Sequence, residues 1–263
     1  MSETGPPEAL RRSLVADVPL VAAIGWHDEI GSTNAELLSR PGAPTGTVLV
    51  ADVQTAGRGR RGRTWHAPAG SSLMSSVLLR PSIPARTWPV LPLAVGTAVL
   101  EACRVVVDGM DPARLALKWP NDLLVDGVKA AGILVEASGD RVVAGMGINV
   151  DWRGVARPPE VQATSLAEAA GGDVDRWRLL EVLLVALDRH LGLAEADPGG
   201  VVGRYAPDCA TVGVEVTAQG AAPIEGTAVG LTPEGHLRIR TRDGGDRVVA
   251  AGEVEHVRAA HHE

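Results

Sequence analysis

The spacing of apolar positions predicts both strands and helices in the larger, N-terminal part of the chain. Short apolar runs bounded by turn residues predict strands over residues 47–53, 72–79 and 141–150. Apolar positions recur with a helical period over residues 90–107 and 176–193, and the second of these segments is strongly amphipathic. We therefore expect an α+β fold in which helices cover a central mixed β-sheet.

Two local motifs mark the ends of predicted elements. Thr33 and Glu36 have the spacing of a capping box, so the GSTN sequence is expected to end a strand over residues 26–30 and to open a short helix through Leu38. An Asp-Gly dipeptide interrupts the apolar pattern of residues 123–136 and predicts a tight hairpin there.

The pattern changes beyond Pro207. Short alternating segments separated by Gly, Pro and Asp run from residue 211 to residue 257, and they predict a small β-barrel of about 50 residues. We place the boundary near residues 205–210. The expected organisation is a main domain over residues 1–207 and a small C-terminal β-barrel domain over residues 208–263.

Composition limits the class of protein. The chain has 263 residues, 45% of them apolar, which is enough for a sizeable core, and a net charge of −7 argues against generic nucleic-acid binding. The longest apolar run is broken by Glu101 and Arg104, and the N-terminus lacks the order of a signal peptide, so a cytoplasmic location is expected. Cys103 and Cys209 are interpreted as reduced, partly buried thiols.

Lysine is unusually rare. Only two of the 25 cationic residues are lysines, and both Lys118 and Lys129 lie in the segment LKWPNDLLVDGVKAAGILVE. Arginine serves equally well on a solvated surface, so a chain that keeps an ammonium group only here indicates a task for which a guanidinium is unsuited. The alternative is codon bias with chance survival of two lysines.

The segment QTAGRGRRGRTW, which begins at Gln54 and ends at Trp65, forms an arginine loop. Glycines let a backbone approach a ligand closely, and neighbouring guanidinium groups bind carboxylate and phosphate oxygens. Because like charges repel, we expect the loop to be mobile when empty and ordered when an anion is bound. An RNA-binding or merely solvated basic loop remains the alternative. Its cationic residues are Arg58, Arg60, Arg61 and Arg63, interleaved with Gly57, Gly59 and Gly62.

A polar group surrounds the KWPND sequence. Pro120 holds the preceding residue extended, so Lys118, Asn121 and Asp122 are expected to enter a strand in fixed positions. Lys129 follows the hairpin turn and is expected on a rigid strand, where an ammonium group suits one fixed anionic oxygen such as an α-phosphate. A surface hairpin with a solvated lysine is the alternative.

Two weaker motifs accompany these. Asn149 follows the Gly-x-Gly of GMGIN, which permits the close approach of a flat ring. Ser32, Thr33 and Asn34 of GSTN offer hydroxyl and amide groups that can pair with a small polar ring. Alone, the first pattern occurs often by chance and the second is more often a helix cap.

Taken together and in this order, the four motifs closely resemble those of the biotin protein ligase family, over most of residues 26–150. The resemblance implies a class II synthetase-like catalytic domain over residues 1–207. It implies an enzyme that uses ATP and Mg²⁺ to convert biotin to biotinyl-5′-AMP. The biotinyl group is then transferred to a lysine of the biotin carboxyl carrier protein or domain of a biotin-dependent carboxylase.

The resemblance also implies roles for individual residues. The catalytic residues would be Lys129, which bridges the biotin carboxylate and the α-phosphate, Arg58, and Asp122, the best candidate to orient or deprotonate the acceptor lysine. The biotin-binding residues would be Ser32, Thr33, Asn34, Gln54, Arg58, Gly59, Arg60 and Lys129. The ATP-binding residues would be Arg58, Arg60, Arg61, Trp65 against the adenine, Lys118, Asn121, and Asn149 near the base.

The resemblance is to the monofunctional type. Only about thirty residues precede Gly31, fewer than a winged helix-turn-helix needs, so neither a specific nucleic acid nor a membrane is expected as a partner. A lipoate or octanoate ligase or transferase of the same superfamily is the first alternative, although its Arg-Arg plus triple-Gly loop is not found. A nucleic-acid-binding module is the second, but apart from Trp65 the arginine loop lacks aromatic residues for base stacking.

Overall fold

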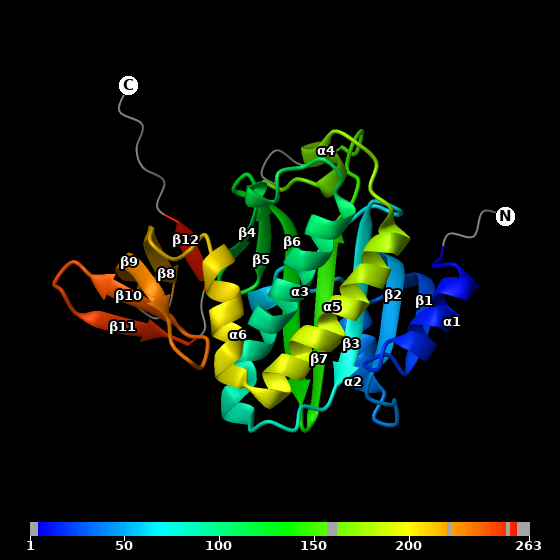
Figure 1. Cartoon of the computed structure of the whole chain (residues 1–263), viewed down its shortest axis with the longest axis horizontal. Coiled ribbons are helices and arrows are strands. Elements are labelled where there is room, and N and C mark those ends of the chain that lie inside the picture. The colour runs from blue at the N-terminus through cyan, green and yellow to red at the C-terminus, as the bar shows by residue number, and fades with distance from the viewer. Residues whose placement is uncertain (1–4, 157–161, 220–221, 251–252, 257–263) are drawn as a thin grey trace.

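The larger part of the molecule is built on a seven-stranded mixed sheet (Figure 1). The computed structural model describes residues 5–156, 162–219, 222–250 and 253–256. The strand order is β1-β2-β3-β7-β6-β5-β4, in which β1 and β2 are parallel and the other pairs antiparallel. The expected α+β fold with a mixed sheet is confirmed. The strands are β1 (Ala23–Ile30), β2 (Thr47–Gln54), β3 (Ser72–Leu79), β4 (Leu115–Lys118), β5 (Asp122–Val125), β6 (Val128–Ser138) and β7 (Arg141–Asn149).

The two faces of this sheet are covered differently. Neighbouring residues of a strand point to opposite faces, and in β3 the side chain of Val77 joins the main core while Leu78 packs with Leu37 of α2. Figure 1 shows α3 and α5 crossing the face that carries the main core. The α2 face is more open and carries the site. The helices are α1 (Glu8–Asp17), α2 (Thr33–Ser39), α3 (Leu91–Val106), α4 (Leu166–Ala170), α5 (Arg176–Ala196) and α6 (Pro198–Tyr205), with short 3-10 turns at Arg60–Gly62, Ala85–Val90, Pro112–Arg114 and Ala206–Asp208.

The start of α2 corrects one prediction. The residue that caps this helix is Ser32, whose hydroxyl accepts from the backbone N–H of Ala35 at 3.4 Å. The Thr33–Glu36 capping box is therefore wrong. The Thr33 hydroxyl instead lies 2.6 Å from the Ser76 hydroxyl, on the surface of the sheet. The Thr33 hydroxyl is therefore part of a polar network on the sheet and does not cap α2.

The β5–β6 hairpin has the turn that its sequence predicts. Asp126 and Gly127 have φ values of 50° and 77°, and two successive residues with positive φ match the right-handed twist of a hairpin. A second hairpin precedes it, because Lys118 at the end of β4 pairs with Asp122 at the start of β5. The Trp119–Pro120 peptide bond between them is cis. The KWPND polar residues therefore lie at one end of two short hairpins.

Helix α3 is apolar because it is buried. Residues Ala85–Val106 form one segment that by length and composition could cross a membrane, yet 61% of its most apolar window is buried inside the molecule. Cys103 of this helix and Cys209 are both free and buried, and burial raises the pKa of the Cys103 thiol to about 12. The predicted absence of a disulfide between them is confirmed, and both thiols are buried, where partial burial was expected.

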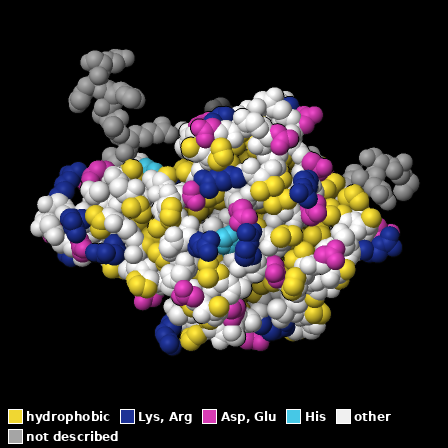
Figure 2. Space-filling model, viewed as in Figure 1, with side chains coloured by type: hydrophobic (Ala, Val, Ile, Leu, Met, Phe, Trp, Pro, Cys, Tyr) yellow, Lys and Arg dark blue, Asp and Glu magenta, His cyan; other side chains and the backbone are white. Residues whose placement is uncertain are grey.

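Figure 2 shows charged side chains of both signs scattered over the molecule on the side seen in Figure 1.

The C-terminal part forms a separate antiparallel sheet in the order β11-β10-β9-β8-β12. The predicted small C-terminal β domain is confirmed, although its described strands form an open sheet and not the closed barrel that was expected. In the described residues no ladder joins β11 to β12, so the sheet is open there, and Val257 lies outside those residues. The domain boundary at residue 207 stays a prediction. The strands are β8 (Glu215–Gln219), β9 (Ile224–Leu231), β10 (Leu237–Thr241), β11 (Asp246–Val249) and β12 (Glu253–His256).

Candidate active site

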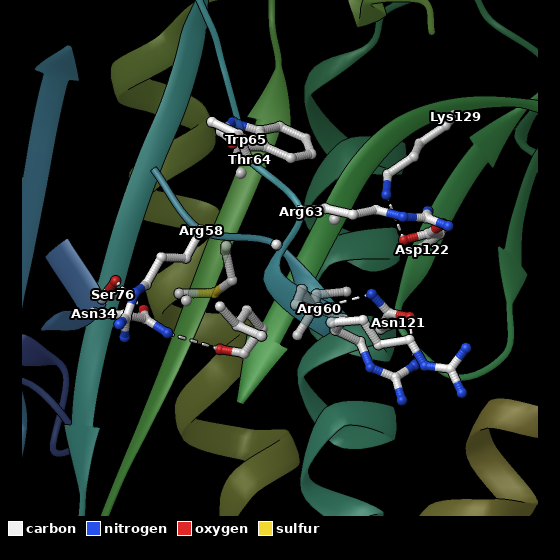
Figure 3. A pocket seen from close by; sticks show the side chains of 18 of the residues that line it. Asn34, Arg58, Arg60, Arg63, Thr64, Trp65, Ser76, Asn121, Asp122 and Lys129 are labelled. Carbon is white, nitrogen blue, oxygen red and sulfur yellow. Dashed lines mark hydrogen bonds and ion pairs between the residues drawn. The ribbon is translucent and has the colours of Figure 1, made fainter. Parts of the chain in front are cut away.

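A cavity on the α2 side of the sheet brings the four motifs together (Figure 3). Among the described residues that line it are all the predicted site residues except Asn149. Segments more than a hundred residues apart in the chain meet here because β7 and β6 lie next to β3 in the sheet. The predicted residues on its wall are Ser32, Thr33, Asn34, Gln54, Arg58, Gly59, Arg60, Arg61, Trp65, Lys118, Asn121, Asp122 and Lys129.

One end of the cavity is a chain of hydroxyl and amide groups. The backbone N–H of Thr33 donates to Gln54 Oε1 at 2.8 Å, which leaves the Gln54 amide nitrogen turned toward Met74 Sδ at 3.4 Å. Ser76 Oγ lies 2.6 Å from Thr33 Oγ1 and donates to Asn34 Oδ1 at 2.6 Å. This end therefore presents both donors and acceptors on a rigid surface, as a small polar ring requires.

Three glycines form the floor of the cavity. A Cβ atom at Gly145 would lie 2.2 Å from Asn34 Oδ1, and one at Gly147 would lie 2.5 Å from the Trp65 ring. A Cβ atom at Gly132 would lie 2.9 Å from the same ring. These residues must lack side chains because an amide and an indole lie directly on the sheet. The Gly-x-Gly of GMGIN does permit the approach of a flat ring, and the ring found there is the indole of Trp65.

Trp65 lies in the middle of the site. Its Nε1 atom is buried and has no hydrogen-bond partner among the described residues. Lys129 Nζ lies 5.7 Å from the ring centroid, within the range of a cation–π contact. The backbone N–H of Trp65 donates to Gly57 O at 3.0 Å, which closes the arginine loop on itself. Trp65 is therefore positioned to offer a flat apolar surface beside a cation.

Each of three arginines of the arginine loop has its own protein partner. Arg58 Nη1 lies 3.1 Å from Glu136 Oε1, and Arg60 Nη1 donates to Asn121 Oδ1 at 3.0 Å. The third, Arg61, has a positive φ of 56° and donates at 3.0 Å to the backbone oxygen of Gln219, the last residue of β8. The loop is thus connected to β6, to KWPND and to β8. Its ordering by a ligand stays a prediction.

Lys129 and Asp122 form an ion pair at the other end of the cavity. Lys129 Nζ lies 2.8 Å from Asp122 Oδ1, and the two side chains are 34% and 20% exposed. In Figure 3 this pair lies apart from Arg58, which is beside Asn34 and Ser76. The structure therefore brings two of the three predicted catalytic residues together and places Arg58 with the ring-binding groups.

Asn149 serves a neighbouring segment. Its side chain is 1% exposed, it is absent from the described cavity wall, and its amide nitrogen donates to Thr164 O at 2.9 Å. The backbone N–H of Thr164 in turn donates to Lys129 O at 2.8 Å. Asn149 thus supports the backbone that carries Lys129. Its contact with a nucleotide base stays a prediction.

The C-terminal sheet completes the wall. Val254 of β12 lines the cavity. Thr211 Oγ1 accepts from the backbone N–H of Trp119 at 3.0 Å and lies 3.0 Å from His256 Nε2. Burial first, and then the charge of Lys118, lower the pKa of His256. These residues were not predicted from the sequence, because a contact between distant segments leaves no local motif.

Glu136 and Ser76 were also missed. Both lie on the sheet face that carries the site, and both contact Asn34. The available signal was strand alternation, since Gly132, Leu134 and Glu136 share one face of β6. In the described residues no group of three or more His, Cys, Asp or Glu side chains could hold a metal ion.

Sequence and structure comparisons agree with this geometry. Residues 27–152 match the Biotin/lipoate A/B protein ligase family, and residues 211–257 match the Biotin protein ligase C terminal domain. The chain is 38% identical over 268 residues to a biotin–[acetyl-CoA-carboxylase] ligase of Mycobacterium tuberculosis, covering 96% of this chain and 97% of the relative. It is 39% identical over 174 residues to the bifunctional ligase/repressor BirA of Bacillus subtilis, covering 63% of this chain and 52% of the relative.

A solved structure has the same architecture. The biotin protein ligase from Aquifex aeolicus in complex with biotin and ATP has a TM-score of 0.79 and 34% sequence identity, over 90% of this chain and 99% of that chain. Because 90% of this chain is more than its first 208 residues, the matched part also includes residues of the C-terminal sheet. The chain belongs to the biotin protein ligase family.

Proposed function

We propose that this chain is a biotin protein ligase that activates biotin with ATP and transfers it to a lysine of a biotin carboxyl carrier protein or domain. The observation that carries the proposal is the meeting of four motifs in one cavity with two distinct ends. The end around Thr33 suits a ureido ring, and the end around Lys129 suits an anionic reaction centre.

In the first step a biotin carboxylate oxygen attacks the α-phosphorus of ATP. A P–O bond forms, the bond to the β-phosphate breaks, and pyrophosphate leaves with its electron pair. The barrier is largely electrostatic because two anions meet, and a fixed cation lowers it. Lys129 is proposed to bridge the carboxylate and the α-phosphate, which requires its ammonium group to exchange Asp122 for the substrates.

In the second step the acceptor lysine attacks the acyl carbon of biotinyl-5′-AMP. An amide bond forms, AMP leaves, and the amine gives up a proton. Asp122 is proposed to orient the amine and to accept that proton, since Lys129 can release its carboxylate once the phosphate holds the ammonium group. The arginine loop is proposed to keep water from the mixed anhydride.

The ring end of the cavity supports biotin recognition. Gln54 Oε1 is occupied by the backbone of Thr33, so its amide nitrogen is available to donate to a ureido carbonyl. The hydroxyls of Ser32 and Thr33 are proposed to accept from the ureido N–H groups. Asn34 is proposed to act through Ser76, whose hydroxyl donates to Asn34 Oδ1 and lies beside the Thr33 hydroxyl. Both amide hydrogens of Asn34 already have protein acceptors. Arg58 and Gly59 are proposed to cover the ring.

The other end supports a nucleotide. Trp65 offers a flat surface for the adenine, and Lys129 beside it offers a cation. Mg²⁺ is proposed to enter as the MgATP complex and to neutralise the β- and γ-phosphates. The remaining groups proposed for the nucleotide are Arg60, Arg61, Lys118 and Asn121 on the wall, with Asn149 behind it.

The partner is proposed to be the carrier domain of a biotin-dependent carboxylase, and the location to be the cytoplasm. Neither a nucleic acid nor a membrane is proposed as a specific partner. A gel-shift titration at physiological salt tests this: binding by the arginine loop alone would be weak, salt-dependent and independent of sequence.

One experiment tests the function directly. The protein is incubated with biotin, MgATP and a biotin carboxyl carrier domain, and the carrier is weighed by mass spectrometry. A gain of one biotin, absent when the target lysine is replaced by arginine, is expected. The same reaction with lipoate in place of biotin tests the alternative substrate. A gain with lipoate alone would contradict the proposal.

A further inference from the structure

Glu136 is a carboxylate beside the arginine loop that the proposed reaction does not use. It lies on β6, two residues beyond Leu134 and four beyond Gly132, so its side chain emerges on the face that carries the cavity. Among the described residues Glu136 is absent from the cavity wall, and its side chain is 27% exposed. Glu136 can therefore influence the cavity only through the residues that it contacts.

The two oxygens of this carboxylate have different partners. Oε1 lies 3.1 Å from Arg58 Nη1, whose side chain is 51% exposed. Oε2 accepts from the buried amide nitrogen of Asn34 at 2.9 Å. One oxygen is thus attached to the arginine loop and the other to the sheet surface. Glu136 connects a side chain of a loop to a fixed point in the core.

The side-chain amide of Asn34 is held in one orientation. The Asn34 amide nitrogen also donates to Leu134 O at 3.1 Å, and Asn34 Oδ1 accepts from Ser76 Oγ at 2.6 Å. Gly145 lies directly beneath this amide. A carboxylate held on such a group keeps its free oxygen in one place. The Arg58 guanidinium accordingly has a defined position.

The position is at the ring end of the cavity. Lys129 and Glu136 lie on the same strand, and seven residues of extended chain separate their Cα atoms by about 23 Å. Arg58 is therefore far from the Lys129–Asp122 pair and close to Thr33, Asn34 and the hydroxyl chain. Because Glu136 uses one N–H of the guanidinium, the others remain able to contact a ligand.

We infer that Glu136 is a positioning residue for biotin. It holds the Arg58 guanidinium over the ring end of the cavity. The inference rests on the proposed function. It assigns Glu136 an effect on biotin binding and on the retention of biotinyl-5′-AMP, with no effect on binding of ATP. Pre-organisation of a long side chain is what a second layer of contacts supplies to a binding site.

Glu136→Gln tests this with little change in shape. The glutamine keeps an oxygen for Asn34 but loses the charge that holds Arg58. The biotin KM in pyrophosphate exchange is expected to rise about fivefold to tenfold, while the ATP KM stays within about twofold. Free biotinyl-5′-AMP should also escape faster. Glu181→Gln is the matched control, because Glu181 forms a similarly exposed pair with Arg178 on α5, away from the cavity.

A double-mutant cycle with Arg58→Gln separates positioning from a general structural role. In the Arg58→Gln background, Glu136→Gln is expected to have no further effect on the biotin KM, and the melting temperatures of all variants should agree within a few degrees. Additive effects, or equal rises in both KM values, would overturn the inference. A lower biotin KM in Glu136→Gln would identify Glu136 as a competitor for Arg58 and overturn it as well.

The same experiment distinguishes an error in the proposed function from an error in the role of Glu136. If the wild-type protein shows no biotin-dependent pyrophosphate exchange, the proposed function is refuted and the inference with it. Normal exchange by the wild type with an additive cycle refutes the inference alone. Calorimetric titration of biotin into the four proteins provides the same comparison without turnover.

Discussion

Lys129 Nζ lies 2.8 Å from Asp122 Oδ1 across the β5–β6 hairpin, so the two groups proposed for successive steps of one reaction are already paired. A substrate anion at Lys129 would draw the ammonium group away and leave the carboxylate free. The first step would thereby prepare the base for the second. This order follows from a single ion pair on two adjacent strands.

Replacing Lys129 by alanine is expected to abolish most biotin-dependent pyrophosphate exchange. The loss of a charge-assisted contact costs about 1.5–3 kcal/mol in binding, and more in the transition state. The fold should survive because the side chain is 34% exposed. Lys129→Arg should not restore activity, because a planar guanidinium does not replace a compact ammonium group. Activity within about twofold of wild type in either variant would contradict the assignment.

Asp122→Asn is expected to impair transfer more than adenylation. The amide can still receive a hydrogen bond from Lys129 but cannot accept a proton from the acceptor lysine. Pyrophosphate exchange reports the first step, and a single-turnover reaction of purified biotinyl-5′-AMP with the carrier domain reports the second. A fall of about 100-fold in transfer is expected for loss of a general base. Equal losses in both steps would leave Asp122 as a support for Lys129 only.

Gly147→Ala is expected to displace Trp65. The added Cβ would lie 2.5 Å from the indole, so the ring must leave the floor of the cavity. The ATP KM should rise by about tenfold if the indole stacks on the adenine, since base–aromatic stacking is worth about 1–3 kcal/mol. Gly192→Ala on α5 is the control, because nothing lies within 4 Å of its added Cβ. An unchanged ATP KM in Gly147→Ala would show that Trp65 does not contact the nucleotide.

Glu101 is expected to make stability depend on acid. Burial acts to raise the pKa of this carboxyl, but hydrogen bonds from His190 and Arg189 outweigh it and lower the pKa below 4.5. A carboxyl whose pKa is lower in the folded than in the unfolded state stabilises the protein at pH values above its unfolded-state pKa. This stabilisation is lost as the pH falls through the folded-state pKa. Glu101→Gln should therefore cost at most about 1 kcal/mol at neutral pH, because the pair is partly exposed.

The Glu101 effect is measured by urea unfolding of wild type and variant. The difference in unfolding free energy should be present at pH 7 and shrink as the pH falls below 4.5. A difference that stays constant between pH 7 and pH 3 would show that hydrogen bonding without charge accounts for it.

Hydrogen exchange tests the mobility of the arginine loop. The arginine side chains contact Glu136, Asn121 and Gln219, and such contacts position a side chain without protecting the backbone amides of the loop from solvent. Exchange across residues 57–63 is therefore expected to be fast in the free protein and to slow when biotin and ATP are added. A loop fully protected without substrates would contradict the prediction.

Many residues of the site could be predicted from the sequence, but most of the contacts between them could not. The positions of β2, β3, α3, β6, β7 and α5 follow from hydrophobic periodicity, and the Asp126–Gly127 turn from its dipeptide. Most of the predicted site residues line one cavity, and they could be predicted because each belongs to a contiguous sequence motif. Periodicity cannot show which distant segments touch, so the roles of Glu136 and Thr211 were invisible.

The capping prediction at Thr33 failed for a related reason. Local spacing identifies a residue that can close a helix, but here tertiary contacts decide which hydroxyl does so. Ser32 caps α2 while Thr33 turns toward Ser76 on a strand more than forty residues away. Asn149 shows the same limit, since its motif marks the floor of the cavity while its own side chain secures Thr164.

Trp119 joins the two sheets from the inside. Its indole is 2% exposed, its Nε1 donates to Gly235 O at 2.9 Å, and its backbone N–H donates to Thr211. Removing the C-terminal sheet would leave a large apolar ring and two donors without cover at the position where Lys118 and Asn121 are held. The C-terminal sheet is therefore part of the catalytic scaffold, and the two sheets should melt together in a single thermal transition.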